Sequence, residues 1–187
     1  MNGKCGRKES AAVSERISNV HFRLMSLFLR LRELFSPPQE KLLEAAIKPG
    51  EVVLDYGCGI GGYSLAAAEL VGAKGKVYAV DIHPLALRTV ERRVTSKGLR
   101  NVKTLRTDCA ISLDGETVDV VLLYDVLHDL PVPELVLEEL HRVLKPGGVL
   151  SLSDHHMKEE DIVTKVATRG LFRLAGRGAR TYSFVRT

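Results

Sequence analysis

A glycine-rich turn directly after a short apolar run is the first feature of this sequence that could do chemistry. Residues 52–56 read VVLDY, and four glycines follow within residues 57–62. Glycine lets the backbone turn sharply and approach a ligand without a Cβ in the way, and a helix that begins there offers unpaired N–H donors. Asp55 would bring a carboxylate into the same turn. The arrangement predicts a ligand site.

The glycine spacing alone leaves two classes of ligand open. Gly57, Gly59 and Gly62 satisfy the dinucleotide pattern G-x-G-x-x-G, and Asp81 could accept a ribose hydroxyl. However, the Asp55 carboxylate would repel a pyrophosphate and attract a cationic amino group. The remaining chain completes one sheet and leaves no second domain for a hydride acceptor. A nicotinamide-binding protein therefore remains the alternative interpretation.

A second group of reactive side chains follows two later apolar runs. Its members are Asp125, His128, Asp129, Asp154, His155 and His156. They could line a substrate pocket, with His128 or His155 as general base. Asp125, Asp154 and His155 could instead hold a divalent metal, but magnesium prefers oxygen ligands. They could also be surface loop and capping residues. We predict no metal, with His128, Asp125 and His155 as the catalytic candidates.

Alternating strand and helix patterns predict the scaffold that positions both groups. Apolar runs at 52–56, 76–80, 102–106, 118–124 and 149–153 alternate with helical patterns at 63–71, 84–97, 133–144 and about 158–168. Two final runs, 171–175 and 181–185, flank a Gly-Arg-Gly turn and predict a hairpin. The pattern indicates an α/β fold: a doubly wound seven-stranded sheet, with five parallel strands plus a C-terminal antiparallel hairpin and helices on both faces. The carboxyl ends of parallel strands form a ligand crevice.

The first 35 residues form a separate unit. Residues 1–13 are a polar tail, and residues 20–35 repeat apolar side chains with the period of an amphipathic helix. Ser36-Pro37-Pro38 ends this helix, and Pro37 or Pro38 can open a second helix that runs through Ile47. The first helix could close over the site as a lid, pack on the flank of the sheet, or form a homodimer or an interfacial contact.

Composition and charge exclude several classes. Residues 1–35 carry seven Lys or Arg and three Asp or Glu, residues 36–161 carry fourteen and twenty, and residues 162–187 carry six and none. This acidic centre does not suit a nucleic-acid groove. Three cysteines predict no disulfide framework. No apolar stretch approaches the roughly 18 residues of a membrane span, and no signal peptide is evident. We expect a cytoplasmic protein.

Five motifs in order give the sequence a family resemblance. They are LDYGCGIGG, VYAVDIHPLAL, RTDCA, VDVVLLYDVLHDLP and RVLKPGGVLSLSD. Together they make residues 36–187 resemble a class I S-adenosylmethionine-dependent methyltransferase domain. The last two motifs are most similar to the small-molecule branch that includes quinone-biosynthesis and arsenite methyltransferases.

The resemblance implies S-adenosylmethionine as the cofactor and assigns ten positions to it. The methionine end would contact Asp55, Tyr56 and the backbone of Gly57, Cys58 and Gly59, the ribose and adenine would contact Asp81, Ile82, Asp108 and Cys109, and Tyr124 would lie near the methionine amine.

The resemblance also implies in-line methyl transfer to a small-molecule acceptor. The sequence YDVLHD differs from the [DNS]-P-P-[YFW] of the enzymes that methylate amino groups of nucleic acids and glutamine. An arsenite methyltransferase would need positioned thiols, whereas Cys58 and Cys109 lie in the cofactor turns and Cys5 in the tail. A catalytically silent cofactor-binding partner subunit remains a further alternative.

Overall fold

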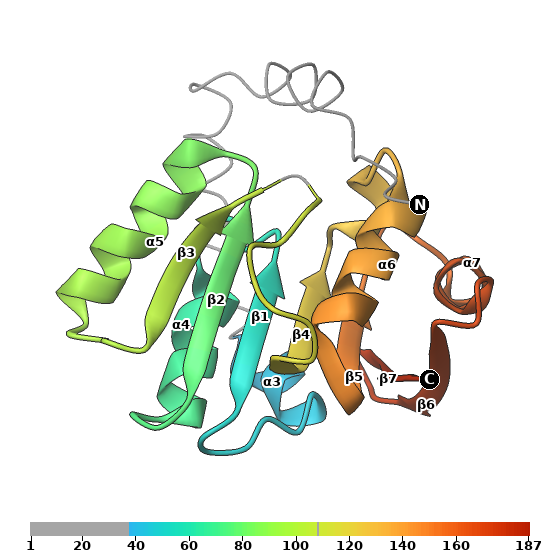
Figure 1. Ribbon diagram of the computed structural model, residues 1–187, viewed down its shortest axis with the longest axis horizontal. Coiled ribbons are helices and arrows are strands. Elements are labelled where there is room, and N and C mark those ends of the chain that lie inside the picture. The colour runs from blue at the N-terminus through green and yellow to red at the C-terminus, as the bar shows by residue number, and fades with distance from the viewer. Residues whose placement is uncertain (1–37, 108) are drawn as a thin grey trace.

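A seven-stranded sheet forms the centre of the computed structural model, which describes residues 38–107 and 109–187 (Figure 1). The strands are β1 (Val52–Tyr56), β2 (Lys76–Asp81), β3 (Val102–Arg106), β4 (Val118–Tyr124), β5 (Leu144–Ser153), β6 (Phe172–Arg177) and β7 (Tyr182–Arg186). Their order is β3-β2-β1-β4-β5-β7-β6. The first five are parallel, and β7 is antiparallel to both β5 and β6. The predicted sheet is therefore confirmed. The predicted tail, N-terminal helix and domain boundary at residue 36 lie outside the described residues.

Helices cover both faces of the sheet because strand side chains alternate between the faces. The helices are α3 (Gln39–Glu44), α4 (Gly62–Val71), α5 (Pro84–Ser96), α6 (Pro133–Val143), α7 (Glu159–Ala167) and a 3-10 turn, η1 (Leu127–Asp129). Val53 and Leu122 pack with side chains of α3 and α4, whereas the neighbouring Leu54 and Leu123 pack with α6 and α7. In Figure 1, α6 lies in front of the sheet and α4 behind it.

Two element boundaries differ from the sequence prediction by three residues or more, whereas the other bounds differ by at most two. β5 begins at Leu144 instead of residue 149, and the pairing jumps from Val118–Leu144 to Val120–Val149. The Lys-Pro-Gly-Gly segment between these pairs is thus an irregular part of one strand that interrupts its pairing with β4. α3 ends at Glu44 instead of Ile47, because Ala46 takes a left-handed conformation with φ of 53°.

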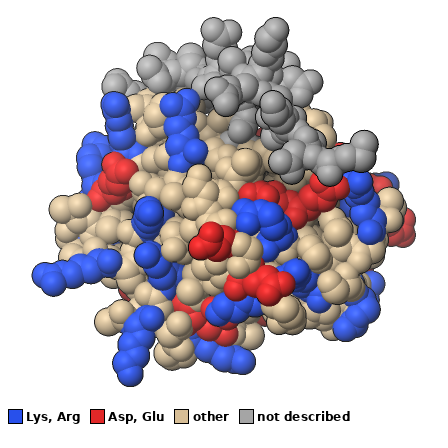
Figure 2. All heavy atoms as spheres, in the orientation of Figure 1, with Lys and Arg blue, Asp and Glu red and all other residues tan. Residues whose placement is uncertain are grey.

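The basic C-terminal segment is largely neutralised by carboxylates from the acidic centre. Arg180 Nη2 lies 2.8 Å from Glu40 Oε2, and Arg186 Nη2 lies 3.1 Å from Glu116 Oε1. Two further pairs are Arg177–Glu159 and Arg169–Glu138. Figure 2 accordingly shows acidic and basic side chains intermixed on the visible face. Within residues 38–107 and 109–187, no helix has the length and apolar character needed to cross a membrane.

Candidate functional site

The glycine turn between β1 and α4 is fastened to the end of β2. Gly57 N–H and Cys58 N–H both donate to Val80 O, at 2.8 and 2.9 Å. Gly57 has φ of 75°, and a Cβ there would lie 2.4 Å from Val126 Cγ2. Glycine is therefore required at this position for both conformation and space. Because these amides donate inside the protein, the turn would contact a ligand through carbonyl oxygens, which accept from a cationic amine.

Asp55 is the buried acid of this turn. Its side chain accepts a 2.5 Å hydrogen bond from Ser64 Oγ on α4, and the residue is 2% exposed. Burial raises the pKa of Asp55 to about 7, Ser64 opposes the shift, and the charge of Asp81 adds to it. A cation beside Asp55 would favour its ionised form. The side chain of neighbouring Tyr56 is buried and belongs to the core cluster that includes residues of α6.

Asp81, at the end of β2, is oriented by two backbone donors. Its Oδ1 accepts from His83 N–H at 2.8 Å, and its Oδ2 accepts from Gly59 N–H at 2.9 Å. Burial raises the pKa of Asp81, and these donors oppose the shift. Each carboxylate oxygen retains capacity for another donor, so Asp81 could accept from a diol. The next residue, Ile82, is partly buried and accepts from Arg106 Nε through its carbonyl at 3.1 Å.

The segment after β3 is described except for Asp108, whose predicted adenine contact lies outside the described residues. Cys109 N–H donates to Thr107 Oγ1 at 3.1 Å, so the amide predicted to meet a ring nitrogen has a partner within the loop. The side chains of Cys58 and Cys109 are both buried. Burial raises the pKa of Cys58 well above its ordinary value.

Tyr124 ends β4 within a cluster that includes an unforeseen residue, Lys41. The Tyr124 hydroxyl lies 2.7 Å from Ser151 Oγ, and its ring meets the ring of Tyr63 edge-on at 4.8 Å. Burial raises the pKa of Tyr124. Lys41 Nζ lies 5.2 Å from the Tyr124 ring centre and 5.7 Å from that of Tyr63, and it donates to Ser153 Oγ at 2.7 Å. Lys41 precedes the buried Leu42 in the sequence, but no sequence pattern indicates that Lys41 contacts Tyr124, Tyr63 and Ser153.

Asp125 and His155 form the first of two acid–histidine pairs at the ends of β4 and β5. His155 Nδ1 lies 2.8 Å from Asp125 Oδ1, and Lys41 Nζ lies 3.8 Å from Asp125 Oδ2. Burial alone would raise the pKa of Asp125, but the His155 hydrogen bond and the charge of Lys41 lower it below its ordinary value. Asp125 has φ of 56°, an uncommon conformation for a residue with a side chain.

In the second pair the acid follows β5 and the histidine follows β4: Asp154 contacts His128 in η1. His128 Nδ1 lies 2.9 Å from Asp154 Oδ2, and His128 Nε2 lies 3.3 Å from Oδ2 of the exposed Asp129. The His156 ring lies between the two pairs, 4.3 Å from the His128 ring and 3.8 Å from that of His155. The structure thus brings together all six polar residues singled out at these strand ends.

These six residues do not form a metal centre of the kind considered from the sequence. Asp125, Asp154 and His155 are divided between the two pairs. In the part of the chain that the structure describes, no group of three or more His, Cys, Asp or Glu side chains could hold a metal ion.

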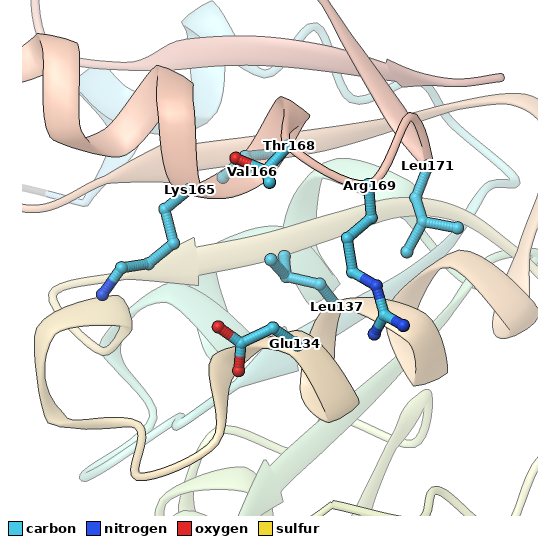
Figure 3. A pocket seen from close by; sticks show the side chains of 7 residues that line it. All are labelled: Glu134, Leu137, Lys165, Val166, Thr168, Arg169 and Leu171. Carbon is cyan, nitrogen blue, oxygen red and sulfur yellow. The ribbon is translucent and has the colours of Figure 1, made fainter.

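A separate shallow groove lies between α6 and α7 (Figure 3). Glu134 and Leu137 extend into it from α6, and Lys165 and Arg169 extend from α7 and the loop after it. None of the residues predicted to bind a cofactor or to act in catalysis lines this groove.

Comparisons with known proteins identify relatives of this chain. A family model described as a methyltransferase domain matches residues 47–171. A demethylmenaquinone methyltransferase from Geobacillus stearothermophilus is 32% identical over 138 residues, covering 73% of this chain and 58% of that protein. An arsenite methyltransferase from Halobacterium salinarum is 34% identical over 111 residues, 59% of this chain and 28% of the relative. The chain therefore spans little more than half of these curated relatives at most.

A solved structure extends the similarity over nearly the whole chain. The SAM-dependent methyltransferase from Aquifex aeolicus aligns with a TM-score of 0.72 and 27% identity, over 95% of this chain and 97% of that one.

Proposed function

The chain belongs to the class I S-adenosylmethionine-dependent methyltransferases, in the branch that contains demethylmenaquinone and arsenite methyltransferases, and on this premise we propose that it transfers a methyl group to a small organic molecule. The observation that carries the proposal is the buried Asp55 carboxyl beside the glycine turn, with its pKa raised to about 7. The α-ammonium of the cofactor is a counter-charge that would favour the ionised form of this buried acid.

The residues at the strand ends fit the other parts of the cofactor. Asp81 would accept from the ribose hydroxyls, since its two oxygens are fixed by His83 and Gly59. Ile82, Asp108 and Cys109 would border the adenine, and Tyr124 would line the methionine end. Once bound, the cofactor supplies an activated methyl group on a sulfonium. The protein then has to hold the acceptor in line with that methyl group, and positioning of this kind contributes about 7–11 kcal/mol.

An apolar organic acceptor of the kind named for the demethylmenaquinone relatives is favoured over arsenite. Arsenic chemistry requires thiolates that the acceptor can reach, and a thiolate is favoured by an exposed, positively charged setting. Cys58 and Cys109 are instead buried, and the pKa of Cys58 is raised. Where the acceptor carries a proton at the methylated atom, His128 is the candidate general base and His155 the second candidate.

Nothing in the comparisons supports a nicotinamide cofactor or a silent partner subunit. The predicted homodimer would use the N-terminal helix, which lies outside the described residues. We also propose the cytoplasm as the working compartment, because three cysteines at unrelated spacings suit a reducing environment.

Calorimetry of the full chain with S-adenosylhomocysteine and with NADH tests the cofactor assignment. We expect stoichiometric binding of S-adenosylhomocysteine and none of NADH; the reverse result would overturn the assignment. The acceptor is then sought by incubating the protein with methyl-labelled cofactor and a small-molecule extract, and following the label by mass spectrometry. Binding without label transfer to any molecule would instead support the silent-subunit alternative.

A further inference from the structure

The contact between Asp154 and His128 determines which nitrogen of the imidazole carries a proton. His128 Nδ1 lies 3.0 and 2.9 Å from the two carboxylate oxygens of Asp154. The Asp154 side chain is fully buried, whereas that of His128 is 23% exposed. An ionised carboxylate only accepts hydrogen bonds, so Nδ1 has to be the donor. The neutral ring therefore carries its proton on Nδ1 and its lone pair on Nε2.

Asp154 is itself held in place from the backbone. Its Oδ2 accepts from His128 N–H at 3.0 Å, and its Oδ1 accepts from His156 N–H at 3.1 Å. These bonds come from η1 and from the residues after β5, so the carboxylate joins two segments that are 26 residues apart. A buried carboxylate with donors on both oxygens has little freedom to rotate, and it fixes the plane of the ring that it contacts.

We propose that Asp154 is a positioning residue that presents Nε2 of His128 as the base of the proposed methyl transfer. The inference rests on the proposed function and extends it. The acceptor's proton passes to Nε2, the bonding pair stays on the acceptor atom that receives the methyl group, and the imidazolium later returns the proton to solvent. Asp154 remains ionised throughout and stabilises the imidazolium.

The surrounding charges distinguish His128 from His155. The His155 side chain is 59% exposed, and its acid, Asp125, is also 3.8 Å from Lys41. Around His128, the acid on the Nε2 side is Asp129, whose side chain is 81% exposed and can turn toward water to admit an acceptor. A further titratable neighbour is the His156 ring, which contacts both His128 and His155.

The tautomer can be measured directly on the full chain without any acceptor. Long-range ¹H–¹⁵N spectra of ¹⁵N-labelled protein distinguish a proton on Nδ1 from one on Nε2, and His128→Gln assigns the signal. We expect neutral His128 in the wild-type protein to carry its proton on Nδ1. A proton on Nε2 in the wild type would overturn the proposal.

Asp154→Asn provides the matched perturbation, because it keeps the shape of the side chain and adds an amide donor. We expect the Nε2–H form of His128 to become the main tautomer. Asp119→Asn is the control: Asp119 accepts from Val52 N–H and Lys145 Nζ, and it lies at the start of β4, whereas Asp125 and His128 follow the end of that strand. This variant, like Asp129→Asn, should keep the proton on Nδ1. An unchanged tautomer in Asp154→Asn would refute the positioning role.

Label transfer into a small-molecule extract connects the tautomer to catalysis. General bases contribute about 10²–10⁴-fold, so we expect Asp154→Asn to lower transfer by roughly 100-fold while affinity for S-adenosylhomocysteine stays within about twofold. The double variant with His128→Gln should be no slower than His128→Gln alone. Additive losses would mean that Asp154 acts independently of His128. If the wild-type protein does not bind S-adenosylhomocysteine, this counts against the proposed function, whereas the tautomer measurement does not depend on that binding.

Discussion

Replacing Asp55 by Asn should stabilise the protein without ligand while it weakens the binding of the cofactor. The folded protein raises the pKa of Asp55 from its ordinary 3.8 to about 7. A raised acid pKa means that the contribution to stability is fully present below the unfolded value and is lost as pH rises through the folded value. At 1.36 kcal/mol per unit, the carboxylate costs about 4 kcal/mol above pH 7. Asp55→Asn removes this cost, but the buried amide of Asn would itself destabilise the protein by about 1–3 kcal/mol if its N–H donor lacks a partner.

The expected result is therefore a pH-dependent difference between the two proteins. Near pH 5 the cost of ionising Asp55 falls to about 1–2 kcal/mol, which is comparable with the penalty of the amide, so the two proteins should have similar stability. At pH 8.5, Asp55→Asn should be more stable by about 1–3 kcal/mol, which is a few degrees in Tm for a domain of this size. Urea unfolding at the two pH values, with Asp119→Asn as control, gives the comparison.

Calorimetry gives a second measure of the same carboxyl. If a cationic amine ionises Asp55, binding of S-adenosylhomocysteine at pH 7 should release about half a proton, seen as a dependence of the binding heat on the buffer. The proton release should disappear in Asp55→Asn. The affinity of this variant for S-adenosylhomocysteine should be at least tenfold lower. A stability difference that does not change between pH 5 and 8.5, or a variant less stable than the wild type at pH 8.5, would refute the reasoning.

Three further changes test other parts of the site. Asp81→Ala should reduce affinity for S-adenosylhomocysteine at least tenfold, because a diol loses its charged acceptor; undiminished binding in calorimetry would contradict the role of Asp81. Gly57→Ala should cost about 2–4 kcal/mol in urea unfolding, given the φ of 75° and the 2.4 Å approach to Val126, and Val126→Ala should restore part of it. Lys41→Met should lower stability at pH 7 by about 1 kcal/mol, and the difference should shrink toward pH 3 as Asp125, whose pKa is lowered partly by Lys41, becomes protonated.

The fold could be predicted because apolar runs and loop chemistry agree at each element. The bounds of β1, β3 and β4 match the predicted runs, since each is a short apolar or β-branched segment between turn residues. The early start of β5 could not be read from its Lys-Pro-Gly-Gly segment, because these residues normally end an element. Only the partner strand β4, through pairing of Val118 with Leu144, continues the strand across them.

The candidate site was predictable as a set of positions but not as a set of contacts. Asp55, Asp81 and the histidines could be located because they lie at or shortly after the carboxyl ends of strands, and these ends share one edge of the sheet. Which acid pairs with which histidine depends on side-chain direction at the strand ends, so the crossed arrangement has no signal in the spacing. Lys41 was missed for a related reason: its contacts to Ser153 and Tyr124 come from residues more than 80 positions away.

The crossed pairs also govern how this edge of the protein can diverge. Since His128 is joined to Asp154 and His155 to Asp125, each strand end depends on the other for the partner of its own side chain. A substitution at one position leaves a polar side chain without its partner at the end of the other strand. In related sequences, substitutions at positions 128 and 154 should therefore occur together, and so should substitutions at positions 125 and 155.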